Sequence, residues 1–211
     1  MLLPPADFKL DSKRYSRLGE LGFRRGGEQV YRPHCPNCQA CVSCRVPVAR
    51  FQANRSQRRC LRRHQTTQTF IKPAAFDPEQ YALYRRYHAA RHADDEQPEQ
   101  ISPESYMDFF VCRWQTTRFV EFRQAERLFA VAVVDWLDHG LSAVYTFFDP
   151  EAARLSPGVY AVLWQIEHAK ELGLEYVYLG YWIENCRKMQ YKIAYQPLEG
   201  RIGQNWLEIG E

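Results

Sequence analysis

The chain has 211 residues, of which 45% are hydrophobic and 25% are charged, and these values are typical of a globular protein. The N-terminus lacks a basic segment followed by a long apolar run, and no apolar run reaches bilayer length, so we expect neither a signal peptide nor a membrane span. Seven cysteines, an odd number, argue against a secreted disulfide scaffold and predict a protein of the reducing cytoplasm.

The first part of the chain predicts short helices and strands around a cysteine-rich loop. The expected elements are a helix over residues 12–22, a hairpin over 23–31, a strand over 42–51, a basic helix from Asn54 or Ser56 to about His64, and a strand over 66–71. The hairpin is expected to turn at Gly26-Gly27. Pro47 places the strand over 42–51 at a sheet edge or at a bulge. A helix over 77–93, a polar loop over 94–100 and a helix opened by Ser102 follow.

The second half has the order strand, strand, strand, helix, strand. The expected elements are strands over residues 118–123, 128–137 and 141–148, a helix over 158–172 ended by Gly173, and a strand over 175–183. The first three strands predict an antiparallel meander. This is the core order of acyltransferases of the N-acetyltransferase (GNAT) type. We therefore expect an α+β fold with two parts, a Cys-containing α/β region over residues 1–75 and a GNAT-like domain over 76–211.

The loop that enters the long helix differs from the pattern of acetyl-CoA enzymes. Such loops hold a pyrophosphate on the helix N-terminus and usually show Gly-x-Gly or Gly-x-Ala. Here a bulky residue takes the second small position, in Gly158-Val-Tyr160. The sequence therefore predicts that the fold is kept and that this coenzyme is not.

The net charge of +3 conceals a strongly basic segment. Residues 29–76 contain nine Lys or Arg and no Asp or Glu. Five arginines recur every three or four residues of the expected basic helix: Arg55, Arg58, Arg59, Arg62 and Arg63. A charge run is usually a solvated helix face, but here no carboxylate compensates the repulsion. The segment therefore indicates a polyanionic partner such as a nucleic acid, and these five arginines are candidates for binding its phosphates.

Four cysteines follow one another at a three-residue spacing: Cys35, Cys38, Cys41 and Cys44. Thiolates in this pattern fit a zinc ion or an iron–sulfur cluster. Zinc ribbons, however, pair two Cys-x2-Cys units across a longer loop, so the pattern also fits a loop of partly buried thiols. Both interpretations stay open at this point.

An aromatic strand over residues 176–183 is followed by a polar, basic segment over 184–192. Half of the aromatic rings pack into the core by alternation, and the other half are free to line a pocket. The segment after the strand end is where sites gather. No P-loop, dinucleotide fingerprint, Gly-x-Ser-x-Gly or His-Glu-x-x-His motif is present, so no ATP site and no activated nucleophile is indicated.

Several long motifs together resemble the aminoacyl-tRNA–protein transferases, the family of the arginyl-tRNA–protein transferases. The matching segments are Tyr31–Cys38, Arg45–Val48, Ser56–Arg63, Ser142–Pro150, Gly158–Glu167 and Leu179–Lys192. They span nearly the whole chain, and they are most similar to the bacterial subgroup that transfers leucine. One departure is that the Cys-x-Tyr-Leu-like segment that precedes these motifs in the family is not found in this sequence.

The resemblance implies the transfer of leucine from leucyl-tRNA to the α-amine of proteins that begin with Asp or Glu. The product then carries a destabilising residue and is degraded through the N-degron pathway. An aminoacyl ester is already activated, so the chemistry requires no cofactor, and zinc or an iron–sulfur cluster would be structural. Positioning the two reactants is worth roughly 7–11 kcal/mol in such a reaction.

The resemblance and the fold order together place a pocket where the fourth and fifth strands of the GNAT-like domain part. Tyr145, Asp149 and Glu167 are the catalytic candidates, with the two carboxylates as bases and Tyr145, Tyr181 or a backbone amide at the oxyanion. The candidates for binding the aminoacyl group or the acceptor are Tyr160, Trp164, Gln165, Tyr178, Gly180, Tyr181, Lys188, Met189, Tyr191 and Lys192. On the last strand, Tyr178, Gly180 and Trp182 are expected on one face and Tyr181 on the other.

Three alternatives remain at this stage. The donor could be arginyl-tRNA, the protein could be a noncatalytic RNA-binding module with a zinc knot, or it could use acetyl-CoA, which the altered loop disfavours. The aromatic residues could also fill the core without lining a pocket. The oligomeric state does not follow from the sequence.

Overall fold

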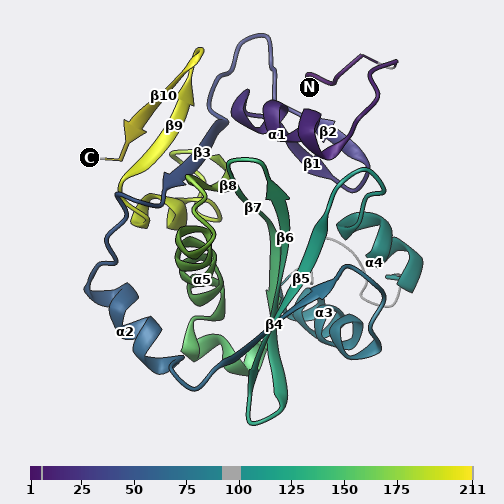
Figure 1. Cartoon of the computed structure of the whole chain (residues 1–211), viewed down its shortest axis with the longest axis vertical. Helices are drawn as coiled ribbons and strands as arrows, with labels where there is room; N and C mark the ends of the chain where they lie inside the picture. The colour runs from purple at the N-terminus through teal and green to yellow at the C-terminus, as the bar shows by residue number, and fades with distance from the viewer. Residues whose placement is uncertain (6, 92–100, 211) are drawn as a thin grey trace.

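The computed structural model describes residues 1–5, 7–91 and 101–210, so the polar loop expected over 94–100 lies outside the described residues. An eight-stranded sheet dominates it, in the order β10-β9-β3-β8-β7-β6-β5-β4 (Figure 1). The strands are β3 (Val42–Pro47), β4 (Gln68–Pro73), β5 (Thr117–Gln124), β6 (Arg127–Leu137), β7 (Gly140–Phe148), β8 (Tyr176–Trp182), β9 (Leu198–Ile202) and β10 (Asn205–Ile209). Neighbouring strands are antiparallel except for β7 and β8, which are parallel.

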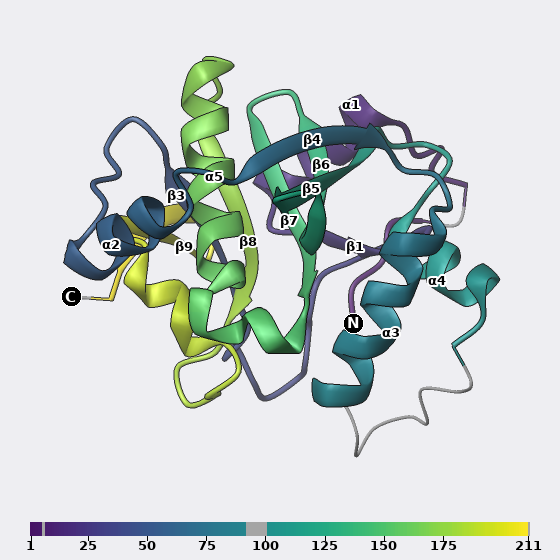
Figure 2. The ribbon, with the colours of Figure 1, turned by 90° about the horizontal axis from the view of Figure 1, so that it is seen from below.

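Helices cover both faces of the sheet (Figure 2). They are α1 (Ser12–Glu20), α2 (Arg55–Arg63), α3 (Pro78–Arg91), α4 (Pro103–Phe110) and α5 (Pro157–Glu171), with the 3-10 helices η2 (Pro150–Leu155) and η3 (Gln190–Ala194). One face packs on α5, with α2 beside it, and the other packs on α3 and α4. The hairpin of β1 (Arg24–Gly26) and β2 (Gln29–Tyr31) lies with α1 on the same face as α3. None of the described helices is long and apolar enough to cross a bilayer.

Local sequence signals explain most of these elements. Asn54 caps α2 through a capping box with Gln57, and Ser102 caps α4 through the amide of Ser105. The run Leu128–Val134 in β6 is buried on both faces, because α5 covers one and α3 with α4 covers the other. The predicted hairpin, meander, long helix and final aromatic strand are all present, and the α+β, GNAT-like fold prediction is confirmed.

The edge position offered for the strand with Pro47 is not found, although a bulge is present in its pairing with β8, and the predicted faces of β8 are wrong. β3 is internal, with β9 on one side and β8 on the other, and Pro47 simply ends it. Cys44 pairs with Gly180 and Arg45 with Tyr178, so Leu179 is an extra residue on β8. This bulge reverses the expected alternation. Tyr178 packs with α1 and the β1–β2 hairpin, whereas Trp182 packs with the α5 cluster.

The parallel pair β7–β8 parts after a short contact. Only residues 140–142 of β7 pair with residues 176–178 of β8, and β7 then runs on to Phe148 without β8 beside it. Gly140 is required at the start, because a Cβ there would lie 2.3 Å from the carbonyl oxygen of Tyr176. Strands from both sides of residue 75 share this one sheet, and the division of the chain at that residue stays a prediction.

Candidate active site

A cavity of about 630 Å³ occupies the space where β7 and β8 part. It is bounded by β7, the start of α5, the end of β8, the segment after β8, and two arginines of β1. Figure 2 shows the two strands diverging around this region, with η2 on one side and the loop after β8 on the other. The structure therefore places a cavity at the predicted position.

Arg24 holds the two diverging strands together. Its guanidinium donates to the carbonyl of Ala143 on β7 at 2.6 Å and to that of Tyr178 on β8 at 3.3 Å. Gly180, which has a φ of +86°, follows directly, and a Cβ there would lie 3.7 Å from the Arg24 guanidinium. The left-handed conformation favours glycine, and it turns β8 away from β7 beside the arginine.

Arg25, the next residue, is fixed in the opposite direction. Its Nε and Nη2 atoms donate to the carboxylate of Asp135 at 2.6 and 2.7 Å, and both side chains are fully buried. Nη2 also donates to the carbonyl of Phe110 and to Thr117. Such a forked, fully partnered pair anchors the short β1–β2 hairpin against β6.

Lys192 lies at the same end of β8 and is 7% exposed. Its ammonium donates to the carbonyl of Tyr181, and no carboxylate within the described part of the chain is paired with it. Burial, reinforced by the charge of Arg24, lowers the pKa of Lys192 to about 8. A lysine with this pKa is partly neutral at physiological pH and is able to accept a proton.

The cavity is lined by both basic and apolar residues. Its described lining contains six basic residues and no acidic one: Arg24, Arg25, Arg91, Arg187, Lys188 and Lys192. The lining also contains the apolar residues Val144, Phe148, Val159, Val162 and Leu179. A site of this composition accepts an apolar side chain together with negatively charged groups.

The N-terminus of α5 opens into the cavity. Ser156 is the N-cap with a φ of +59°, and its side chain forms no cap hydrogen bond. Gly158 and Val159 of the first turn line the cavity. The amides of a first helical turn have no partner within the helix, and the helix dipole favours an anion there.

Six of the predicted site residues line this cavity: Tyr145, Gly180, Tyr181, Lys188, Tyr191 and Lys192. Burial raises the pKa of Tyr145, so its hydroxyl stays protonated and remains a hydrogen-bond donor. Arg24, Arg25, Arg91 and Arg187 were not among the predicted residues. A sequence signal for Arg24 and Arg25 does exist, because they are adjacent arginines in a short hairpin that an apolar core surrounds.

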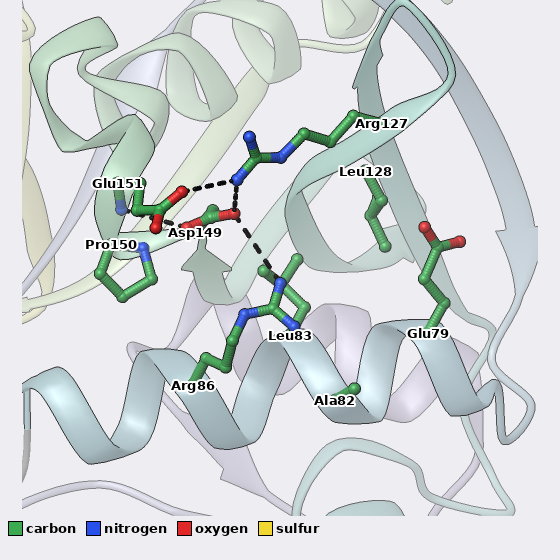
Figure 3. Close-up of a pocket in the computed structure, with 9 residues that line it drawn as sticks. All are labelled: Glu79, Ala82, Leu83, Arg86, Arg127, Leu128, Asp149, Pro150 and Glu151. Carbon is green, nitrogen blue, oxygen red and sulfur yellow. Dashed lines mark hydrogen bonds and ion pairs between the residues drawn. The ribbon is translucent and has the colours of Figure 1, made fainter.

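Asp149 lies elsewhere, in a separate cavity of about 520 Å³ between α3 and η2 (Figure 3). Its carboxylate is 2.6 Å from Arg127 and 3.8 Å from Arg86, and it accepts the amide of Glu151. Burial acts to raise the pKa of Asp149, but the hydrogen bonds from Arg127 and the Glu151 amide, together with the charges of Arg127 and Arg86, outweigh it and hold the pKa below its usual value. The prediction of Asp149 as a base in the strand-parting cavity is corrected, because ion pairing fixes this side chain outside it.

The other predicted residues also lie outside the strand-parting cavity. Glu167 is on the outer face of α5 and pairs with Lys170 at 3.0 Å. Three residues of α5 are engaged within the protein: Tyr160 stacks on His64, Trp164 on His168, and Gln165 donates to the carbonyl of Ala161. Tyr178 packs edge-on against Trp206, and Met189 is not part of the cavity wall. For Tyr160, Trp164, Gln165 and Tyr178 the core-filling alternative describes their contacts.

The four cysteines do not assemble into one site. Cys44 is fully buried in β3, with its Sγ atom 3.3 Å from the carbonyl oxygen of Gly180, and burial raises its pKa to about 11. Cys35 and Cys38 are exposed and Cys41 is half-buried. Among the described residues no group of three or more Cys, His, Asp or Glu is placed to hold a metal ion. The four-cysteine ligand set is therefore corrected, because Cys44 faces the core.

The five arginines of α2 are all exposed. None of them forms an ion pair with a carboxylate in the described ranges. Two of them donate to backbone carbonyls, Arg58 to Ala53 and Arg63 to Arg154. The helix therefore presents uncompensated positive charge to solvent, at the lower left of the sheet in Figure 1.

Comparison with known proteins gives this geometry its context. Residues 4–59 match the family model for the N terminus of arginine-tRNA-protein transferase, and residues 79–202 match the model for its C terminus. The chain is 50% identical over 201 residues to an aspartate/glutamate leucyltransferase of Pseudomonas fluorescens, covering 95% of this chain and 85% of the relative. It is 48% identical over 203 residues to the enzyme of that name from Nitrosococcus oceani, covering 96% and 85%. The chain belongs to the arginine-tRNA-protein transferase family. It is an aminoacyltransferase of that family.

Solved structures show the fold of this transferase in more distant proteins. The C-terminal domain of a putative lysylphosphatidylglycerol synthetase from Agrobacterium fabrum superposes with a TM-score of 0.53 at 15% identity, covering 80% of this chain and 51% of that one. L-PGS from Bacillus licheniformis gives a TM-score of 0.50 at 12% identity, covering 75% and 53%. At these identities the likeness concerns the fold alone, and it agrees with the predicted acyltransferase architecture.

Proposed function

We propose that this transferase moves leucine from leucyl-tRNA to the α-amine of proteins that begin with Asp or Glu, in the cavity between β7 and β8. The observation that carries the proposal is a cavity lined by apolar side chains and by basic residues that have no carboxylate partner among the described residues, Arg24 and Lys192 among them. The names of the relatives supply the donor and the acceptor. The product would begin with leucine and would be degraded as an N-degron. A protein that acts on tRNA would work in the cytoplasm.

The donor's leucyl side chain fits the apolar lining residues Val144, Val159 and Val162. The free amides at the start of α5 are then available to the terminal phosphate of the tRNA. The same helix end holds a pyrophosphate in acetyl-CoA enzymes of this fold, and here Tyr160 fills the core behind it by stacking on His64. This arrangement supports a tRNA end as the occupant of the loop.

Transfer requires one nucleophilic substitution at the ester carbonyl. The amine nitrogen forms a bond to the carbonyl carbon, the carbon–oxygen bond to the terminal ribose breaks, and the ribose oxygen takes the second proton lost by the nitrogen and leaves as a hydroxyl. Lys192 accepts a proton from the attacking ammonium, because it is the buried lysine of the cavity and is partly neutral near pH 8. Tyr145, which lines the cavity and remains protonated, would donate to the developing oxyanion. No cofactor enters this sequence, because the ester is already activated.

The direct test incubates the protein with labelled leucyl-tRNA and a peptide that begins with Asp, beside an identical peptide that begins with Ala. We expect label in the Asp peptide alone. Arginyl-tRNA in a parallel reaction tests the alternative donor. Transfer from arginyl-tRNA in preference to leucyl-tRNA would correct the donor, and binding of tRNA with no transfer from either would favour the noncatalytic RNA-binding alternative.

Helix α2 is predicted to contact tRNA phosphates. Replacement of Arg58, Arg59, Arg62 and Arg63 by alanine should raise the Kd for tRNA and flatten its dependence on salt by about 0.7–0.9 in log–log slope per lost contact. These side chains are exposed, so the melting temperature should change little. Replacement of four other exposed basic residues, Lys9, Lys13, Arg17 and Arg113, provides a charge-matched comparison. An unchanged salt slope would remove α2 from the tRNA interface.

A further inference from the structure

A second cavity, of about 380 Å³, lies beside the cysteine loop of residues 33–41. Tyr181 lines both this cavity and the one between β7 and β8. Its hydroxyl lies 3.1 and 3.0 Å from the carbonyl oxygens of Gly22 and Tyr31. Tyr31 faces the first cavity and the next residue, Arg32, faces the second. The two cavities are therefore neighbours on either side of one aromatic ring.

Two arginines converge on the wall of this second cavity. A Cβ on Gly22 would lie 3.0 Å from Cδ of Arg201 and 3.6 Å from Cδ of Arg32, so the two side chains run next to each other. Arg32 donates to the carbonyl of Leu21 at 2.7 Å, and Arg201 donates to those of Glu20 and Gly203 at 3.2 and 2.6 Å. Burial and the charge of Arg32 lower the pKa of Arg201.

This half-buried pair lacks the carboxylate partner that the buried Arg25 and Arg45 have. Arg25 binds Asp135 and Arg45 binds Glu199. Neither Arg32 nor Arg201 has a carboxylate within ion-pair distance in residues 1–5, 7–91 and 101–210. Two half-buried arginines whose side chains run next to each other, with no carboxylate partner among the described residues, are suited to bind an anion.

We propose that Arg32 and Arg201 bind the side-chain carboxylate of the acceptor's N-terminal Asp or Glu. This inference rests on the proposed function and identifies the site that recognises the acceptor's N-terminal residue. The buried cations of the first cavity are already engaged, Arg24 with two carbonyls, Arg25 with Asp135 and Lys192 with the carbonyl of Tyr181. Arg32 and Arg201 also donate to backbone carbonyls, but they are half-buried, line the second cavity across Tyr181 and have no carboxylate partner among the described residues.

A tRNA phosphate is the other anion available, and the arrangement of the molecule disfavours it. The exposed arginines of α2 lie at the lower left in Figure 1, whereas the cysteine loop that bounds the second cavity lies at the top. The second cavity is bounded by that loop and by β3 and β9, away from α2. A charged pair at this place also explains a preference for Asp and Glu over Asn and Gln, because a neutral amide leaves both guanidinium groups uncompensated.

The test uses the full-length protein, leucyl-tRNA and three peptides that differ only in beginning with Asp, Glu or Asn. The variants are Arg32→Ala and Arg201→Lys, and the second keeps the charge but loses the forked geometry. Arg113→Ala is the control, because this side chain is 98% exposed and lies outside both cavities. Steady-state constants are measured separately for peptide and for leucyl-tRNA.

We expect each variant to raise the KM for the Asp and Glu peptides by about tenfold or more, the effect of losing a charged hydrogen bond, and to reduce the preference for Asp over Asn. The KM for leucyl-tRNA should stay within about twofold of the wild type in both, and this also shows that the variants are folded. If the KM for leucyl-tRNA rises instead, the pair contacts phosphate and the inference is wrong. If the wild type is active and both variants keep their peptide KM, the inference fails alone; an inactive wild type would instead contradict the proposed function and the inference with it.

Discussion

Replacing Lys192 by methionine is expected to lower the rate of leucyl transfer by about 10²–10⁴-fold, the usual contribution of a positioned proton acceptor. The same variant is expected to be at least as stable as the wild type at pH 7. Burial lowers the pKa of Lys192 from 10.5 to about 8, and a shift of this size corresponds to a cost of about 3 kcal/mol when the side chain is charged in the folded protein. Methionine removes this cost, although it leaves the carbonyl of Tyr181 without its donor. A loss of activity with no loss of stability distinguishes a functional lysine from a structural one.

The pH dependence of this variant has a definite sign. The unfolded protein keeps the proton of Lys192 up to about pH 10.5, and the folded protein keeps it only up to about pH 8. The unfolded state therefore binds more protons across this interval, so the free energy of unfolding of the wild type gains a contribution that rises with pH, and the variant lacks it. The transfer rate of the wild type should rise through about pH 8 as Lys192 becomes neutral.

The comparison for Lys192→Met is Lys13→Met on the exposed surface of α1. The α-amine of the acceptor also titrates near pH 8. The Lys13→Met variant keeps Lys192, so its pH profile contains the titrations of both groups. Stability is measured by urea unfolding at pH 7 and pH 9.5, and transfer at saturating substrates over the same range. A variant that keeps its rate and its pH profile would exclude Lys192 as the proton acceptor.

Replacing Asp135 by asparagine is expected to lower the free energy of unfolding by about 3–5 kcal/mol, because Arg25 is left as a buried charge without its counter-ion. Both side chains are fully buried, and the Asp135 carboxylate also accepts from Thr117 at 2.8 Å. For a chain of this size a loss of 1 kcal/mol lowers the melting temperature by about 2–4 °C, so a fall of roughly 6–20 °C is expected.

The control for Asp135→Asn is Asp138→Asn, on the exposed turn after the same strand. The double variant Arg25→Met with Asp135→Leu should recover part of the stability, because it removes both charges together. We do not expect the double variant to restore leucyl transfer. The neighbouring Arg24 joins β7 to β8, and its position depends on the hairpin that Arg25 anchors. Equal melting temperatures for Asp135→Asn and Asp138→Asn would show that the pair does not hold the hairpin.

Local signals were sufficient for the elements that position the site. The cap at Asn54, the alternation of the meander and Gly173 at the end of α5 act within a few residues of the elements that they define. The strand order then indicated where β7 and β8 part, and six of the predicted site residues line the cavity there. These inferences are possible because periodicity, capping and the order of the strands depend on residues that are close together in the sequence.

Other assignments depended on contacts between distant residues. Asp149 ends its strand as expected, but its direction is decided by Arg127 and Arg86, which lie on other elements. The faces of β8 depend on its bulge at Leu179, which exists only in its pairing with β3. Tyr160 lies in the first turn of the predicted helix. Its ring stacks on His64 of another element and therefore does not line the cavity. None of these partners can be chosen from spacing along the chain.

The sequence by itself determined the order of strands and helices, the family, and the basic character of α2, because each is a property of residues close together in the chain. The tertiary structure decided which charges are neutralised and which are not. Arg25 meets Asp135 across 110 residues, and Arg32 meets Arg201 with no carboxylate within ion-pair distance in the described residues. The role of a charged side chain depends on the groups that lie within a few ångströms of it, and the tertiary structure sets these distances.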